Sequence, residues 1–382
     1  MATDNYSQFD EIRPFNPSEL PAVYDRLLAS EQFRKVLTYL YPGVDMQTIA
    51  GMMHRCRTNL EFQKALCYPF LEQLLAKASH GCDMDASAID SGKRYTFVSN
   101  HRDIVLDSAL LDKMLIDNGF TTTCEIAIGD NLLSLPWVRD LVRVNKSFIV
   151  ERSLQPRQML MASKRLSEYM HLVISDKNDN IWIAQREGRA KDSDDRTQPS
   201  VLKMMAMGGD RNPVESLKQM HIVPLAISYE YDPCDYLKAR EFQLKRDVEG
   251  WKKSPQDDVE SMRVGIMGFK GRIHYHCAPC VDDWLESVGS TLPKTELFNA
   301  LAEEIDKRIF SSYRLYANNY VAAHKLGDAD YSSNFTKEEE ETFMRYIDGQ
   351  LTKIDIPGKD EEYLRERLLV MYANPLFNSL KV

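Results

Sequence analysis

The amino-acid sequence predicts an α/β fold, with a largely parallel or mixed sheet, flanking helices, and helical N- and C-terminal regions. Short β-rich runs recur between residues 91 and 290, and helical periodicity separates the earlier ones and dominates both ends of the chain. Strand–helix alternation is typical of βαβ units and parallel sheets. We therefore expect a helical N-terminal region (1–90), an α/β domain (91–290) and a helical C-terminal region (291–382).

The N-terminal region predicts amphipathic helices. Ser30 is a suitable N-cap for a helix that Pro42 and Gly43 would end. Apolar residues before and after Ser30 recur at helical spacing, which indicates faces packed in a core. Those faces carry Leu20, Val23, Tyr24, Leu27, Phe33, Val36, Leu37 and Leu40.

The central stretch predicts six strands rich in β-branched and aromatic residues. The helix-patterned segments IVLDSALLDKML and RQMLMASKRLSEYM lie between the earlier strands. Ligand sites in such sheets form where strands end and helices begin. The six strand segments are RYTFVS from Arg94, TCEIAI from Thr123, SFIVE from Ser147, NIWIAQ from Asn180, IVPLAISY from Ile222 and GRIHYHC from Gly271.

Composition excludes several classes of protein. The 382 residues carry a net charge of −9, which argues against broad nucleic-acid binding because such binding needs clustered positive charge. Apolar runs are too short to span a bilayer, and the polar N-terminus lacks the apolar core of a signal peptide. Seven cysteines, an odd number, fit reduced thiols. We expect a cytoplasmic location.

The segment FVSNHRDIVLD, Phe97 to Asp107, carries the strongest catalytic signal. His101 falls at a predicted strand-to-helix turn, where Asp103 is placed to cap the helix and Asp107 lies one turn further on. A carboxylate that orients an imidazole makes the imidazole a general base. The alternative is an ordinary loop histidine, with Asp103 acting only as a cap.

A second group of polar residues follows two other predicted strands. Arg152 ends one of them, and Arg186, Glu187, Gly188 and Arg189 lie just beyond the next. A planar guanidinium binds phosphate through two hydrogen bonds, and glycine lets the backbone approach a ligand closely. Arginines that converge at one edge of the sheet would suit a phosphorylated substrate.

These segments, in this order, resemble the glycerolipid acyltransferase family, which includes glycerol-3-phosphate and lysophosphatidate acyltransferases. The family carries N-H-x4-D, an apolar run that ends in Arg, a Glu-Gly-Thr/Gly-Arg-Ser block, and a strand with Val/Ile-Pro. The corresponding segments here are NHRDIVLD, FIVERS, QREGRA and IVPLAISYE. The GDNLLSLPWVRDLVRVNKSF stretch and the Tyr229–Glu230 pair are similar to the larger bacterial glycerol-3-phosphate acyltransferases.

The resemblance implies a peripheral enzyme at the cytoplasmic face of the membrane that acts in phospholipid biosynthesis. His101 would be the general base, oriented by Asp107. Arg152, Glu187, Gly188 and Arg189 would bind the acceptor, glycerol 3-phosphate or a lysophospholipid. Acyl-CoA or acyl-ACP would supply the acyl group, and neither a cofactor nor a metal is implied.

Two departures from the family pattern leave alternatives open. The first block reads His-x5-Asp, with Leu106 at the family's Asp position, so either Asp107 or Asp103 is the partner of His101; we favour Asp107. The third block is one residue short before Arg189, and Lys191 is a possible substitute.

Other readings of the chain also stay open at this point. A catalytically silent lipid-binding protein of the same fold and an acyl-thioester hydrolase are the two alternative functions. Cys277 and Cys280 form a Cys-x-x-Cys pair near two histidines, which suits zinc or redox chemistry, but no second ligand pair follows at a usual spacing. Met159, Met161 and Met170 would fill the core or line a flexible acyl groove.

Overall fold

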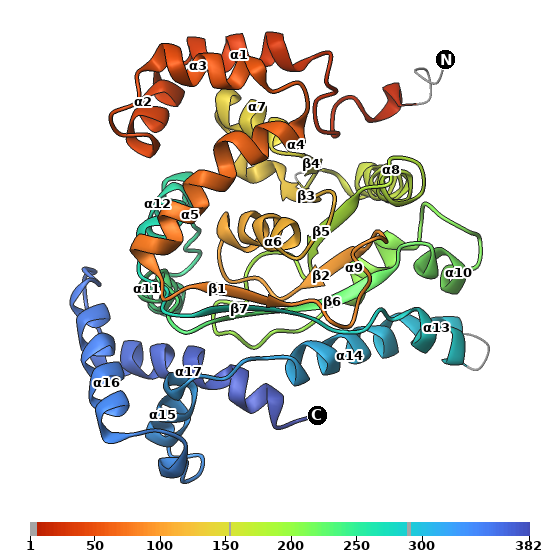
Figure 1. Cartoon of the computed structure of the whole chain (residues 1–382). Helices are drawn as coiled ribbons and strands as arrows, with labels where there is room; N and C mark the ends of the chain where they lie inside the picture. The colour runs from red at the N-terminus through yellow and green to blue at the C-terminus, as the bar shows by residue number, and fades with distance from the viewer. Residues whose placement is uncertain (1–5, 153, 289–291) are drawn as a thin grey trace.

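The computed structural model describes residues 6–152, 154–288 and 292–382. In these residues seven strands form one sheet, in the order β1-β7-β6-β2-β5-β3-β4, and helices cover it (Figure 1). The predicted fold class is therefore confirmed. The strands are β1 (Cys82–Asp85), β2 (Thr96–Ser99), β3 (Cys124–Gly129), β4 (Ser147–Val150), β5 (Asn180–Ala184), β6 (Ile222–Tyr229) and β7 (Ile273–Cys277).

The sheet is mixed rather than fully parallel. Five strands from β6 to β4 run in one direction, whereas β7 pairs with β6 antiparallel and β1 pairs with β7 parallel. Six strands lie in the predicted segments, but β1 falls in the region we expected to be helical. Its sequence, CDMD, is only four residues long, includes two aspartates and lies at the sheet edge, so it carries no β-rich pattern.

Different helices pack against the two faces of the central strands. Phe97 points into a core with α5 and α6, whereas Val98, the next residue, points into a core with α8, α9 and α14. This alternation is the period-two pattern of a strand buried on both faces. The five helices are α5 (Tyr68–Ala78), α6 (Leu106–Asp117), α8 (Pro156–Ser175), α9 (Pro199–Met205) and α14 (Lys294–Ser311).

The N-terminal helices have a core of their own, which also includes residues of α7 (Figure 1). Ser30 caps α2 as predicted, because its side chain accepts a hydrogen bond from the Phe33 amide. Most of the apolar face identified in the sequence is buried here, whereas Val36 and Leu40 are only partly buried and lie outside this core. The helices are α1 (Leu20–Ala29), α2 (Glu31–Leu40), α3 (Met46–Arg55), α4 (Asn59–Phe62) and α7 (Pro136–Val144).

The C-terminal helices form a further core beside α11, away from the N-terminal helices (Figure 1). Thr336 begins α16 with a capping box in which Glu339 is the reciprocal partner. The remaining helices are α10 (Pro213–Lys218), α11 (Asp235–Asp247), α12 (Pro255–Met267), α13 (Asp282–Val288), α15 (Ala317–Leu326), α16 (Lys337–Thr352) and α17 (Glu361–Ser379).

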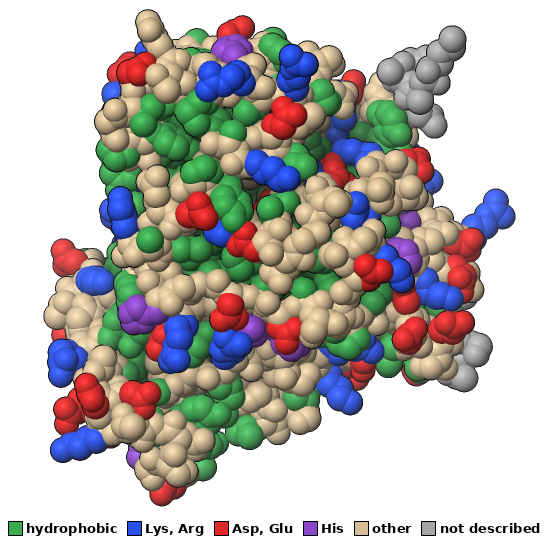
Figure 2. Space-filling view, in the orientation of Figure 1, with side chains coloured by type: hydrophobic (Ala, Val, Ile, Leu, Met, Phe, Trp, Pro, Cys, Tyr) green, Lys and Arg blue, Asp and Glu red, His purple; other side chains and the backbone are tan. Residues whose placement is uncertain are grey.

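The surface is mixed in charge. Figure 2 shows basic and acidic side chains interspersed over the face in view, with apolar side chains between them. Among the residues that the structure describes, no helix combines the length and the apolar composition needed to cross a bilayer.

Candidate active site

His101 lies at the carboxyl edge of the sheet, between β2 and α6. Asn100 fixes the turn, because its side chain donates to the Ile227 carbonyl at 2.9 Å and accepts from the Ile227 amide at 2.8 Å. These bonds tie the end of β2 to the neighbouring strand β6. The imidazole therefore projects from a turn between β2 and α6 that is anchored to the buried strand β6.

Asp107, in the first turn of α6, is the carboxylate bonded to His101. Its Oδ2 lies 2.7 Å from His101 Nδ1, and accepts from the backbone amides of Arg102 at 2.6 Å and Asp103 at 3.0 Å. Its Oδ1 accepts from the Tyr229 hydroxyl at 3.1 Å. The Asp107 side chain is only 1% exposed, so four donors hold this carboxylate in one orientation.

Asp103, the other carboxylate left open by the sequence, has a different position. Its Oδ1 accepts from the amides of Val105 at 2.9 Å and Leu106 at 2.8 Å, which are orphan donors at the start of α6. Burial, and secondarily the charge of Asp107, raise the pKa of Asp103. Gly265 of α12 permits this packing, because a Cβ there would lie 1.9 Å from Asp103 Oδ2.

The His101 ring faces a cavity of about 780 Å³. Trp182 of β5 packs edge-on against the imidazole, with ring centroids 5.4 Å apart, and donates its indole N–H to Ser99 Oγ at 3.0 Å. Since Nδ1 faces Asp107, Nε2 is the ring nitrogen left for a ligand in the cavity. The arrangement can therefore remove a proton from a group bound there.

Arg152 reaches the same cavity from the end of β4. Its Nη1 lies 3.8 Å from Glu187 Oε1, so two of the residues predicted to bind the acceptor are neighbours. Gly129 at the end of β3 makes room for Arg152. A Cβ at Gly129 would lie 2.5 Å from Asn131 Oδ1 and 2.8 Å from Arg152 Nε.

Two further arginines line the cavity with unsatisfied donors. Arg186 Nε and Arg189 Nη1 are buried and have no hydrogen-bond partner among the described residues. Gly188 separates them in a turn with φ +70°, a conformation that favours glycine. The Glu187 side chain is 70% exposed and so lies at the rim. Buried guanidinium donors without partners are costly, which points to an anionic ligand.

The long polar loop that begins at Arg186 is anchored to the rest of the domain. Arg102 and Asp195 form a buried ion pair with two parallel hydrogen bonds of 2.7 and 2.5 Å. Asp306 Oδ1 accepts from both the amide and the hydroxyl of Thr197. Lys191, the suggested substitute for Arg189, lines the cavity but is ion-paired with Glu241.

One wall of the cavity is apolar, which suits an acyl chain. Met159 lies on this wall, whereas Met170 is buried in the core and Met161 is exposed. The three methionines that the sequence grouped together therefore occupy three different environments. The other apolar residues of the wall include Val150, Ala162, Leu166, Val201 and Met204.

The sequence alone did not predict that Trp182, Tyr229, Gly129 and the ion pair of Arg102 belong to the site. Tyr229 was part of a matched segment, but its contact with Asp107 depends on the pairing of β2 with β6. The partner of Arg102 lies 93 residues away in a polar loop. A local pattern carries no signal for contacts of this kind.

Comparison with protein-family models agrees with the resemblance described above. Residues 83–228 match the model of a family described as Acyltransferase. Among curated proteins, none is significantly similar to this chain. Among solved structures, this chain is similar to the crystal structure of the 1-acyl-sn-glycerophosphate (LPA) acyltransferase PlsC from Thermotoga maritima. The identity is 12%, the TM-score is 0.36, and the match covers 76% of this chain and 92% of that chain.

Proposed function

Residues 83–228 of this chain match the Acyltransferase family model, and from this match we propose that the chain is a glycerolipid acyltransferase, with the reaction and residues that follow. The protein transfers a fatty acyl group from acyl-CoA or acyl-ACP to a hydroxyl of glycerol 3-phosphate or lysophosphatidate. The observation that carries the proposal is the 2.7 Å contact of His101 with Asp107 beside a cavity lined by buried arginine donors.

His101 acts as the general base. A glycerol hydroxyl is a poor nucleophile near neutral pH, so Nε2 takes its proton as the oxygen attacks the thioester carbonyl. Asp107 fixes the ring and stabilises the imidazolium that forms. The tetrahedral intermediate then expels the thiolate, which takes the proton from the imidazolium. Direct transfer of this kind uses no enzyme nucleophile and no cofactor besides the acyl carrier.

The arginines position the acceptor. A phosphate held by Arg152, Arg186 and Arg189 would satisfy the buried guanidinium donors through charge-assisted hydrogen bonds. Glu187 and Gly188 complete the rim beside it, with the Glu187 carboxylate close to Arg152. Fixing the phosphate places the hydroxyl near His101, and positioning alone can supply several kcal/mol of the rate gain.

We favour glycerol 3-phosphate as acceptor, because the GDNLLSLPWVRDLVRVNKSF stretch and the Tyr229–Glu230 pair resemble the larger bacterial enzymes that use it. Lysophosphatidate, or another lyso-lipid, is the second candidate. The proposed setting is the cytoplasmic membrane surface. Leu160 and Met161 of α8, which are 63% and 70% exposed, lie beside the cavity-lining Met159 and would enter the lipid interface.

Product analysis by mass spectrometry tests the proposal. Purified protein is incubated with palmitoyl-CoA or palmitoyl-ACP and with glycerol 3-phosphate or lysophosphatidate, beside a His101→Ala variant. We expect an acylated acceptor with the wild type only. Release of free palmitate that does not depend on acceptor would instead indicate a thioester hydrolase. Lipid binding without turnover for any pair would indicate a catalytically silent protein.

A further inference from the structure

A second hollow, of about 990 Å³, lies at the opposite edge of the sheet from His101. It is lined where β2 and β6 begin, by Tyr95 and His221, and by the segment that follows β7. Because β2 and β6 are parallel, their first residues lie one strand length away from their carboxyl ends. This hollow is therefore separate from the candidate active site.

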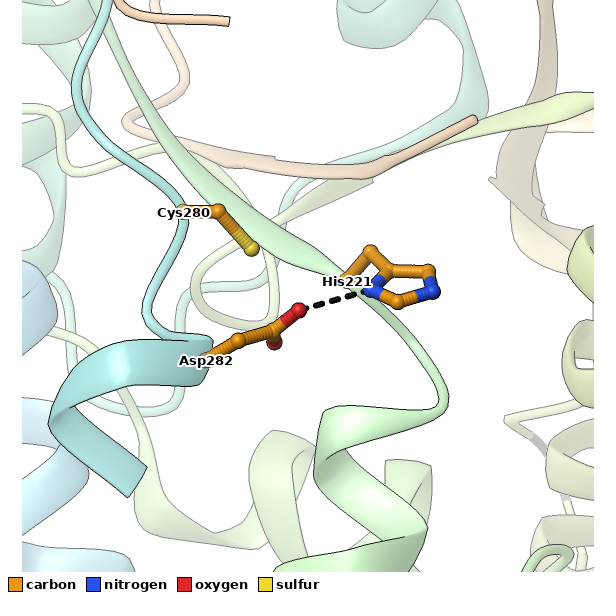
Figure 3. A group of neighbouring side chains, drawn as sticks. All are labelled: His221, Cys280 and Asp282. Carbon is orange, nitrogen blue, oxygen red and sulfur yellow. Dashed lines mark hydrogen bonds and ion pairs between the residues drawn. The ribbon is translucent and has the colours of Figure 1, made fainter. Parts of the chain in front are cut away.

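Three side chains with different metal-binding atoms meet in this hollow. His221, Cys280 and Asp282 each offer one ligand atom, and these atoms all lie within 4.8 Å of one another. Figure 3 shows the Cys280 thiol and the Asp282 carboxylate reaching into the same space, with the His221 imidazole beside them. Nitrogen, sulfur and oxygen donors together are the ligand types of zinc sites.

The His221 imidazole and the Asp282 carboxylate are already oriented toward each other. His221 Nδ1 lies 2.6 Å from Asp282 Oδ2 (Figure 3). The His221 backbone has φ +46°, which is uncommon for a residue with a side chain. The second oxygen, Asp282 Oδ1, is buried and has no hydrogen-bond partner among the described residues. A cation would satisfy this orphaned acceptor.

The segment that carries Cys280 is fixed by hydrogen bonds from α14. Arg308 of α14 donates to the carbonyls of Pro279 at 2.9 Å and Cys280 at 3.1 Å. Burial raises the pKa of Cys280 to about 12, so a bound cation has to displace the thiol proton. Cys277, the other half of the Cys-x-x-Cys pair, is buried in the hydrophobic core and does not join the cluster.

We propose that His221, Cys280 and Asp282 bind one divalent cation of the zinc class, with a fourth position open to the hollow. Zinc accepts this donor set at about 2.0–2.3 Å and prefers tetrahedral geometry, which places ligand atoms roughly 3.5 Å apart. His221 Nδ1 and Asp282 Oδ2 therefore separate from their hydrogen bond, and the thiolate moves inward. A hard cation such as Mg²⁺ does not suit a thiolate.

The consequence of binding is structural. The cation would join the residue before β6 to the segment after β7 and to the first residue of α13, parts of the chain that flank the same sheet edge. A ligand that binds only the folded state stabilises it by mass action. The site lies away from His101 and Asp107, so this inference stands or falls separately from the proposed acyl transfer.

Metal binding to the full chain tests the proposal. Reduced, EDTA-stripped protein is titrated with Zn²⁺ against a chromophoric chelator, and with Co²⁺ to observe thiolate-to-cobalt absorption. We expect one Zn²⁺ per chain, and a higher melting temperature with Zn²⁺. Cys280→Ser and His221→Gln should each weaken binding by at least about tenfold, the lower end of the loss reported for residues that merely orient a ligand.

Cys67→Ser is the matched control, because Cys67 is also half-buried with a pKa raised to about 12 by burial. It should keep the wild-type affinity and the cobalt–thiolate absorption, which Cys280→Ser should lose. His221→Gln changes a side chain that is 50% exposed, so folding in EDTA is expected to match the wild type. Weak binding by the wild type, or equal affinity in all three variants, would overturn the proposal.

Discussion

Substitution of the Asp107 carboxylate is the most direct test of His101 as the proposed base. In Asp107→Asn the amide oxygen can replace Oδ2 and still accept from the amides of Arg102 and Asp103. The amide NH₂ would then face the Tyr229 hydroxyl oxygen, so the turn keeps its hydrogen bonds. The substitution therefore removes the negative charge while it leaves the local fold intact.

The loss of this charge determines how far kcat should fall. An imidazolium and a carboxylate about 4 Å apart attract each other by about 4 kcal/mol at an effective dielectric constant of 20. Without that charge the transition state in which His101 holds the proton rises by a similar amount. Each 1.36 kcal/mol is a factor of ten in rate, so kcat should fall by roughly 10³-fold. A flipped amide that selects the wrong imidazole tautomer would bring the loss to about 10⁴-fold.

The assay measures kcat and KM for the acylated product by mass spectrometry, with thermal melts as the folding control. Tyr229→Phe is the matched variant, because it deletes one donor to Asp107 and keeps the carboxylate charge. We expect a loss of about tenfold or less for Tyr229→Phe. A folded Asp107→Asn enzyme within tenfold of wild-type activity would refute the role of Asp107.

Four further predictions follow from single features of the structure. Arg152→Ala should raise the acceptor KM by at least about tenfold with little change in the donor KM, because it removes the proposed charged contact to the acceptor phosphate. Gly129→Ala should act in the same direction, since its Cβ would push the Arg152 guanidinium aside; steady-state kinetics checks both. Leu160→Asp combined with Met161→Asp should abolish sedimentation with anionic vesicles. The rate of acyl transfer from a short-chain acyl-CoA in the absence of membranes should stay unchanged. Burial raises the pKa of Asp306 from its ordinary 3.8 to about 6, so folding stability falls as pH rises between those values, by up to about 3 kcal/mol. Asp306→Asn should remove this slope in urea melts across pH 4–8.

Each of these variants has a control. Arg157→Ala changes an exposed arginine on α8 and should leave the acceptor KM unchanged. Leu380→Asp changes a leucine that is 62% exposed near the C-terminus and should leave vesicle binding unchanged. Asp355→Asn changes an exposed carboxylate and should keep the wild-type slope of stability with pH. An unaltered slope in Asp306→Asn would show that its burial does not disfavour ionisation.

The sequence predicted much of the fold because its signals are local. The strand segments, the Ser30 cap and the amphipathic N-terminal helices depend on residues within a few positions of one another. β1 was not predicted because its four residues, two of them aspartates, form no β-rich pattern and are held at the sheet edge by backbone pairing with β7. Where local patterning is weak, the neighbouring strand decides the structure.

The candidate site was predictable in its members more than in its contacts. The sequence identified His101, Asp107 and the arginines, but His-x5-Asp left the choice between Asp103 and Asp107 open. The turn conformation decided it, because Asp107 Oδ2 meets His101 while Asp103 faces the amides that begin α6. A spacing of residues does not define such a turn, since one extra residue changes which side chain points inward.

What the sequence alone determined, then, is the set of elements and the residue types placed at their ends. Only the tertiary structure decided which of those ends meet. The parallel pairing of β2 with β6 brings Tyr229 to Asp107. The antiparallel pairing of β7 with β6 brings Cys280 and Asp282 to His221. The physical reason is that these contacts join residues dozens of positions apart, and sheet order and packing of the core, rather than local conformational preference, set their distance.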